Sequence, residues 1–383
     1  MLDSRSSFFV MRTATGGFTA AMVGNGININ GTIYEIVSRQ STNQITIDRN
    51  GPNGTGLTLR VGGALQSLSA FSANRGGSNS LWIRAGTYQL SSTWDVGVNL
   101  VGFIRGYGVT RGDGGRPVLK AVSSGFSVIS SSGAGDAHAV IQNLEIDGNS
   151  LATSGINILR HHIHVVNCEV YGCTAGGIHV GVVGSSIISC LVRNCTSSSG
   201  VVSGLRIAST TVRNNTGPGV GLVAGQTLCN NVVSYSNTGD GFYITDHQIH
   251  CVNCTAFGNG GSGFYRSSAP NSGVFINCLS YGNTGWGFNV GSSSRIIYYN
   301  CAAGGNTSGQ FSSLSNCTGI GNITLTANPF VDPSNGDFRL NNLPGGGALC
   351  RAAGTGPVGQ ISALDIGVVQ TASGGNILVF EDD

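Results

Sequence analysis

Residues 165–180, VVNCEVYGCTAGGIHV, and residues 251–266, CVNCTAFGNGGSGFYR, show a phrase that the chain repeats. These two copies have Asn-Cys after an apolar residue, an apolar or aromatic residue two or three places on, a second Cys or Asn, and a Gly before another apolar run. Successive copies lie 16 to 24 residues apart, which indicates a structural period. The Cys position of the phrase is taken by Cys168, Cys190, Thr210, Val232, Cys254, Cys278, Cys301 and Cys317.

A second set of positions follows five residues after the first in every copy: Cys173, Cys195, Asn215, Asn237, Asn259, Asn283, Asn306 and Asn322. The apolar residues that come next alternate with others, as in Gly241-Phe242-Tyr243-Ile244, and alternation predicts strands. A unit near 22 residues is too small to bury its own apolar face and must stack on its neighbours. The period therefore predicts a parallel β-helix, because the Leu-x-x-Leu-x-Leu frame of leucine-rich repeats is absent.

The composition is that of a folded protein with a packed core, at 40% apolar and 9% charged residues. The eleven Cys are expected to be buried thiols, because stacked strands hold equivalent side chains parallel at about 4.8 Å, whereas disulfides need converging Cβ atoms. The five-residue Cys spacing does not match a zinc site. The Asn positions are predicted to form an internal ladder of amide hydrogen bonds.

Charge and hydropathy exclude several classes of function. The nineteen Lys and Arg are scattered and leave a net charge of +2, so no nucleic-acid-binding stripe is expected. No apolar run of 18 residues is present, which predicts no membrane span. The apolar stretch 8–11 is too short for the core of a signal peptide, so no signal peptide is expected.

Three regions are predicted along the chain. Residues 1–62 lack the repeat and alternate in short strands, which indicates a small N-terminal β module. Residues 63–328 hold one capping helix at 64–73, suggested by apolar residues at three-residue spacing, and the parallel β-helix, whose first coil is 81–88. Residues 329–383 are rich in Gly and Pro at their start and are expected to fold back as an irregular C-terminal cap over the last coil.

The Asn-Cys and Asn-Gly coils at about 80–345 resemble the right-handed parallel β-helix repeat proteins, a superfamily that includes pectate lyases and phage tailspikes. Segments 82–88 and 330–340 are similar to segments that recur in that group. The front module, with Gly17-Phe18-Thr19 and Tyr34-Glu35-Ile36, and the segment 106–114 resemble leaders of β-helix proteins in phage and virus-like gene sets. These likenesses imply a right-handed all-β solenoid and a virion protein that leaves the cell by lysis. They specify fold better than function.

One group of acids lies close enough to act together. Glu145 is expected one coil below Glu169, with Asp147 below Tyr171 and Arg193 one coil further on, at Cα spacings of about 5 to 7 Å. Glu145, Asp147, Glu169 and Arg193 are weak candidates for an acid and base pair or for a calcium site. The alternative is a solvated polar patch, which outward carboxylates on strands usually form.

Two outward columns carry aromatic and arginine side chains, which sugar-binding surfaces and subunit interfaces both use. The simpler interpretation is that these side chains only pack against one another on a solvent-exposed face of the sheet. The first column is predicted to hold Tyr171, Arg193, Arg213, Tyr235, Phe257 and Tyr281. The second is predicted to hold His179, Arg206, Gly221, Tyr243, Tyr265 and Asn289.

The sequence predicts a non-enzymatic virion structural or receptor-binding protein, of the tailspike or fibre kind. It would form a homotrimer, attach to other virion proteins through residues 1–62, bind surface glycans through the aromatic columns, and need no cofactor. Two alternatives remain open: a polysaccharide lyase or glycoside hydrolase built around Glu145, Asp147 and Glu169, and a surface adhesin or filament subunit.

Overall fold

The computed structural model describes residues 9–12, 17–23, 26–30, 32–48, 50–52, 54–61, 80–96, 101–108, 111–131, 136–181, 183–223, 225–245, 248–266, 272–290, 295–312, 317–351, 353–354 and 365–367. Contacts divide the chain into two compact units, Met1–Asn74 and Arg75–Asp383. The capping helix predicted at 64–73 lies outside the described residues.

The first unit contains a five-stranded antiparallel sheet in the order β1-β4-β3-β2-β5. Its elements are β1 (Phe9–Arg12), η1 (Ala20–Met22), β2 (Gly26–Ile29), β3 (Thr32–Ser41), β4 (Gln44–Ile47) and β5 (Leu59–Val61). Alternating Ile residues of β2, β3 and β4 point to one side of the sheet and are fully buried there with Phe18 and Tyr34. This unit therefore has a hydrophobic core of its own.

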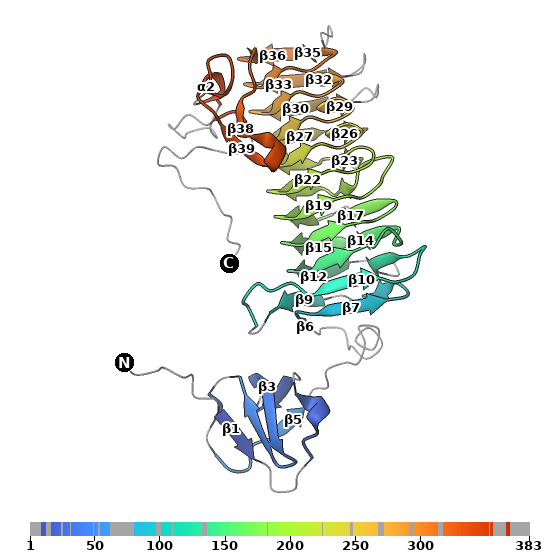
Figure 1. The fold of residues 1–383 in the computed structure, drawn as a ribbon, viewed down its shortest axis with the longest axis vertical. Coiled ribbons are helices and arrows are strands. Elements are labelled where there is room, and N and C mark those ends of the chain that lie inside the picture. The colour runs from blue at the N-terminus through green and yellow to red at the C-terminus, as the bar shows by residue number, and fades with distance from the viewer. Residues whose placement is uncertain are drawn as a thin grey trace, which may run out of the picture. The chain divides into compact units, whose positions relative to one another are not determined.

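The second unit is a solenoid in which each full coil gives one strand to each of three parallel sheets (Figure 1). Sheet 1 consists of β7 (Thr87–Leu90), β10 (Val118–Ala121), β13 (Glu145–Asp147), β16 (Glu169–Tyr171), β19 (Leu191–Arg193), β22 (Thr211–Arg213), β25 (Val233–Tyr235), β28 (Thr255–Phe257), β31 (Leu279–Tyr281), β34 (Ala302–Gly304) and β37 (Ile323–Leu325). Each strand pairs with the equivalent strand of the next coil, so equivalent positions of successive repeats lie side by side. The predicted first coil, residues 81–88, forms β6 (Leu81–Arg84) and the start of β7.

Sheet 2 follows sheet 1 in every coil. It consists of β8 (Trp94–Asp95), β11 (Ser127–Ser130), β14 (Ser154–Ile158), β17 (Gly176–Val180), β20 (Val202–Ser203), β23 (Val220–Leu222), β26 (Phe242–Ile244), β29 (Phe264–Arg266), β32 (Trp286–Val290) and β35 (Gly309–Phe311). Its inward aromatic residues stack along the axis, with the parallel rings of Phe242 and Phe264 4.5 Å apart between centroids.

Sheet 3 completes each coil. It consists of β6 (Leu81–Arg84), β9 (Val101–Tyr107), β12 (Asp136–Gln142), β15 (His161–Val166), β18 (Ser186–Ile188), β21 (Arg206–Ala208), β24 (Leu228–Asn230), β27 (Ile249–Val252), β30 (Ser272–Ile276), β33 (Arg295–Tyr299) and β36 (Thr318–Ile320). None of the helices in the described part of the chain is long and apolar enough to cross a membrane.

The Asn of the repeated phrase marks the corner between sheets 3 and 1. Asn167, Asn253, Asn277 and Asn300 have φ between 49° and 52°, in the left-handed region that Asn tolerates better than most residues. The Cys that follows then points inward, and Cys168, Cys254, Cys278 and Cys301 are fully buried. All eleven Cys are free thiols, and all are buried as predicted except Cys317, which is partly exposed.

The Asn positions form the predicted ladder at the next corner. The Nδ2 group of each Asn donates to the Oδ1 atom of the Asn one coil on, at 2.8 to 3.0 Å, from Asn215 through Asn237, Asn259 and Asn283 to Asn306. The same Oδ1 atoms accept the backbone N–H groups of the preceding coil. The ladder satisfies polar groups that are 5% exposed or less.

Two register predictions were wrong. Pairing of Ala302 with Ile323 puts Asn322 level with Cys301, in the first set of positions and not the second. Cys317 directly precedes β36 of sheet 3 and belongs to neither set, because the corner that follows Cys301 one coil on is at Asn322 and not at Cys317. Arg206 lies in sheet 3, and Ser203 takes the predicted place beside His179.

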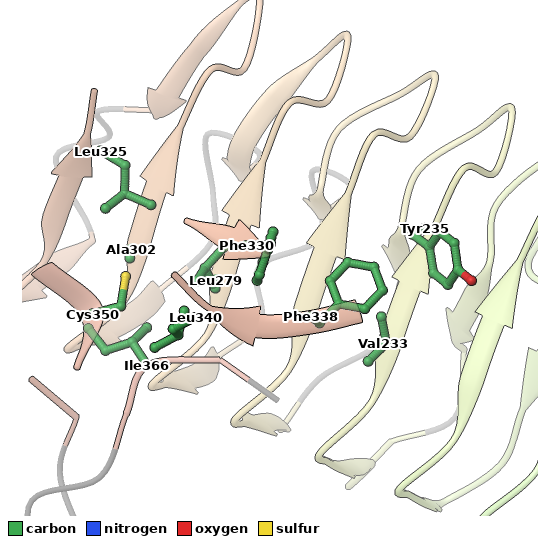
Figure 2. Close-up of a cluster of buried hydrophobic side chains, with 10 residues drawn as sticks. All are labelled: Val233, Tyr235, Leu279, Ala302, Leu325, Phe330, Phe338, Leu340, Cys350 and Ile366. Carbon is green, nitrogen blue, oxygen red and sulfur yellow. The ribbon is translucent and has the colours of Figure 1, made fainter. Parts of the chain in front are cut away.

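The tail folds back along the outside of sheet 1, whereas the sequence predicted a cover over the last coil. Its elements are β38 (Phe330–Asp332), η2 (Pro333–Asn335), β39 (Asp337–Leu340) and α2 (Gly347–Cys350). Figure 2 shows that the side chains of Phe330, Phe338 and Leu340 face those of Val233, Tyr235 and Leu279. The outward residues of β25 to β37 therefore lie in a second hydrophobic core, between sheet 1 and the tail.

Candidate functional site

Sheet 1 carries the first of the two outward columns predicted from the sequence, which we call the outer column. In structural register it runs Lys120, Asp147, Tyr171, Arg193, Arg213, Tyr235, Phe257 and Tyr281. A neighbouring outward column includes Glu145 and Glu169, which are paired as predicted. The structure thus brings the three acidic candidates and Arg193 together on β13, β16 and β19.

Every carboxylate in this group has a partner. The Tyr171 hydroxyl donates to Glu145 Oε1 at 2.7 Å. The Lys120 ammonium lies 3.1 Å from Asp147 Oδ2, and the Asn149 backbone N–H donates to Asp147 Oδ1 at 2.8 Å. We call Arg116, Lys120, Glu145, Asp147, Glu169, Tyr171, Arg193 and Arg213 the charged ladder.

Glu169 lies between two arginines. Arg193 donates from Nε to Glu169 Oε1 at 2.9 Å, and its Nη2 atom is 2.8 Å from the same oxygen. Arg116 approaches Oε2 from the other side at 3.6 Å and also donates to Asn167 Oδ1. The side chain of Glu169 is 19% exposed, so these contacts are partly shielded from water.

Tyr171 is held by groups above and below it. The Arg193 guanidinium carbon lies 4.3 Å from the centre of the Tyr171 ring, in cation–π geometry. Burial and the hydrogen bond to Glu145 raise the pKa of Tyr171 above its usual value, because both disfavour the phenolate. The hydroxyl therefore stays protonated and donates its hydrogen bond to Glu145 over the physiological pH range.

A cleft of about 530 Å³ opens beside the charged ladder. Its floor is sheet 1, with Leu191, Thr211 and Arg213, and one wall is the tail turn Ser334–Gly336. The lining residues are Arg116, Ser189, Cys190, Leu191, Ser209, Thr211, Arg213, Tyr235, Ser334, Asn335 and Gly336. Among these, Arg116 and Arg213 carry the charge, and the remainder offers mainly hydroxyl and amide groups.

The aromatic end of the outer column is covered by the tail. Tyr235 is 6% exposed, and its ring packs edge-on against Phe338 at 5.0 Å. Phe257 contacts both Phe330 and Phe338, and Tyr281 packs against the same core. These three residues, predicted from sequence to face a glycan or a sister subunit, thus face the chain's own tail. Nothing in the repeat itself signals this, although the alternating apolar residues of Phe330–Leu340 could have suggested it.

The other aromatic candidates lie on a different face. Tyr243 and Tyr265 are paired in sheet 2, half-buried, with nearly parallel rings 5.8 Å apart. Because they belong to another sheet, they do not extend the charged ladder. Among the described residues, no three His, Cys, Asp or Glu side chains group as metal ligands.

Comparison with known proteins identifies the fold. A family described as right handed beta helix region matches residues 124–272. Together with the three parallel sheets, this match gives the second unit the right-handed parallel β-helix fold. Comparison with curated proteins returns no match.

Solved structures with some similarity are carbohydrate-active enzymes. The Azotobacter vinelandii mannuronan C-5 epimerase AlgE4 A-module is 18% identical, covers 67% of this chain and 71% of its own, and gives a TM-score of 0.43. Pectate lyase Pel9A is 16% identical, with 79% and 90% covered and a TM-score of 0.45. The catalytic unit of a GH87 α-1,3-glucanase from Streptomyces thermodiastaticus is 9% identical, with 83% and 85% covered and a TM-score of 0.37. None of these likenesses carries an activity over to this chain.

Proposed function

We propose that this chain is a glycan-binding protein that holds its ligand without cleaving it. The observation that carries the proposal is the cleft beside the charged ladder, where two arginines and a set of hydroxyl and amide groups converge on one face of a rigid sheet. Sugar recognition relies on such polar groups placed on a preformed concave surface. Rigid strands also hold a site more precisely than loops do.

The bonding of the carboxylates supports binding over catalysis. A general base needs a lone pair directed at the substrate, and an acid pair for glycoside hydrolysis acts on both sides of one bond. In the charged ladder the Glu145, Asp147 and Glu169 carboxylates accept hydrogen bonds or ion pairs from Tyr171, Lys120 and Arg193. The acids thus fix the geometry of the cations and of Tyr171 beside the cleft.

The stacked pair Tyr243 and Tyr265 supports a second glycan contact on sheet 2. Half-buried parallel rings present an apolar face and a hydroxyl edge, which suits the mixed surface of a sugar. Because the two surfaces belong to different sheets, their contributions can be separated by mutation. Tyr243→Ala with Tyr265→Ala should weaken binding without abolishing retention by the cleft.

We further propose that the protein is a virion component whose first unit attaches it to the particle, and that it assembles as a homotrimer. The leader resemblance supports the virion assignment, and the separate core of the first unit suits an attachment module. Light scattering of the purified chain should give three times the monomer mass. A monomer at micromolar concentration would contradict the assembly.

The experiment that tests the function is incubation of the purified chain with a panel of bacterial and plant polysaccharides. Retained sugar and newly formed reducing or unsaturated ends are both recorded. We expect retention without new ends. New ends that disappear in Glu145→Gln or Glu169→Gln would make the chain a lyase or hydrolase and overturn the proposal. No retention of any glycan would also overturn it.

A further inference from the structure

The exposed part of the outer column ends at a wall. From Lys120 to Arg213, over four strand spacings or about 19 Å, no residue of the column belongs to the core between sheet 1 and the described part of the tail. The next residue, Tyr235, lies beneath the tail, and the turn at Ser334–Gly336 stands beside it. A chain lying along the column therefore meets the tail turn at Arg213 and cannot continue over Tyr235.

The wall itself is fixed in place. Phe338 packs on Tyr235 and Phe257, and Phe330 packs on Phe257, on either side of the turn. Gly336 has a φ of 83°, which favours glycine, and a Cβ at this position would lie 3.1 Å from the Tyr235 hydroxyl oxygen. A side chain at this position would press on the Tyr235 hydroxyl, so Gly336 lets the turn lie close to sheet 1.

The two arginines of the cleft differ in their bonding. Arg116 contacts Glu169 and Asn167. Arg213 is half-buried and makes no hydrogen bond or ion pair with any residue that the structure describes. No acidic residue is among the described residues that line the cleft. A half-buried guanidinium without a partner among the described residues suits an anionic ligand, because it offers the planar fork of donors that carboxylates and sulfates accept.

We infer that the cleft binds the terminal unit of an acidic glycan, with the acidic group at Arg213 and the rest of the chain running along the outer column toward Lys120. This inference rests on the proposed glycan binding and adds which part of the glycan is bound and what charge it carries. Hydroxyl groups of Ser209, Thr211 and Ser334 then meet the sugar hydroxyls. Because the tail turn blocks this end of the column, the site accepts the end of a glycan chain in preference to an internal segment of it.

The number of protein molecules bound per glycan chain tests whether the cleft binds only glycan ends. Polygalacturonate fractions of increasing chain length are titrated with the purified full chain, and the protein bound per polymer chain is measured by light scattering at saturation. The inference predicts the same number of proteins per polymer chain at every length, because each chain offers one matching end. A number that rises with length would show binding to internal segments and overturn it.

Charge is tested with short probes. Trigalacturonate, whose acidic groups are carboxylates, and a carrageenan tetrasaccharide, whose acidic groups are sulfates, are compared with the neutral cellotriose by calorimetry, which separates carboxylate from sulfate as the acidic group. At least one acidic probe should bind more tightly than cellotriose, with an affinity that falls as salt is added. Binding of neutral sugars alone would overturn the acidic assignment and leave the proposed function standing, whereas no binding of any glycan in the panel would remove both.

Mutation of the arginine completes the test. Arg213→Gln should lower the affinity for the acidic probe about tenfold to a hundredfold, as expected for the loss of a charge-assisted hydrogen bond, and should leave the affinity for a neutral sugar unchanged. Arg206→Gln, at an exposed position on sheet 3, is the matched control and should change neither. Equal losses in the two variants, or no loss in Arg213→Gln with an unchanged melting temperature, would contradict the assignment.

Discussion

The outer column of sheet 1 has the same backbone in two regions and different chemistry. From β13 to β22 it carries charged and hydroxyl groups beside a cleft, with the Arg193 guanidinium over the Tyr171 ring. From β25 to β31 it carries Tyr235, Phe257 and Tyr281, which the tail covers (Figures 1 and 2). An outward aromatic residue on a solenoid can thus pack against another segment of the same chain instead of binding a ligand. The side chains that remain for a ligand are the polar ones.

The largest expected effect comes from uncovering the aromatic region. Phe338→Ala removes a ring that is 5% exposed and packs on Tyr235, Phe257 and Phe330, so it should cost about 3 to 5 kcal/mol of unfolding free energy. Denaturant titration measures the loss, and binding of a hydrophobic dye should rise. Arg339→Ala on the same strand points to solvent and should change little. Equal effects of the two variants would show that the tail is not docked.

The interior ladder, from Asn215 to Asn306, passes beneath the aromatic region, whereas Cys173 and Cys195 take the same positions beneath β16 and β19. Asn259→Ala removes the acceptor of the Asn237 backbone N–H and the donor to Asn283, leaving buried polar groups unpaired. We expect a loss of about 2 kcal/mol or more in denaturant unfolding. Asn289→Ala, at a half-buried outward position on sheet 2, should stay within about 0.5 kcal/mol of the unmodified chain. If Asn289→Ala cost as much, the ladder would not be what holds the corner.

In the charged region a comparable truncation should cost far less. Arg193→Ala removes partly exposed contacts with Glu169 and the Tyr171 ring, together worth about 1 kcal/mol. The control is Arg206→Ala on sheet 3, for which no measurable change is expected. A loss from Arg193→Ala as large as that from Phe338→Ala would erase the contrast between a binding surface and a core.

The smallest effect depends on pH and concerns Asp240, at the corner before β26. Burial raises the pKa of this carboxyl, partly offset by the Ser262 backbone N–H that donates to it. A raised pKa means that folding disfavours the ionised form, so Asp240 costs stability as pH rises above its unfolded value of 3.8. Asp240→Asn keeps an acceptor and should be slightly more stable than the unmodified chain at pH 7.

That advantage should shrink as the pH falls toward 3.8, and thermal unfolding across this range would show it. Asp337 has the opposite sign, because hydrogen bonds from Arg339 lower its pKa. Asp337→Asn should therefore gain nothing at pH 7. An Asp240→Asn variant less stable than the unmodified chain at pH 7 would show that its ionised carboxylate is needed.

The sequence predicted the solenoid because period and alternation are local properties. Asn in the left-handed corner, Cys inside it and the stacked amides recur in each copy, and the register of Glu145 with Glu169 follows from counting. Counting failed at Cys317, which precedes a strand of sheet 3 and not of sheet 1, and at Arg206, because the spacing of the sheet 2 strands changes on either side of Val202. It also could not place Phe338 on Tyr235, because that contact joins residues about a hundred positions apart and no periodicity links them. The cleft, which depends on the tail, was beyond prediction for the same reason.

The most direct test of the account is hydrogen–deuterium exchange on the full chain, with and without a glycan that it retains. We expect slower exchange in peptides that cover β16 to β22 and in the tail turn at 334–336, with little change in β31 or the first unit. Protection confined to the first unit or to the Tyr243 and Tyr265 face of sheet 2 would contradict it, because the ligand would then bind away from the charged ladder.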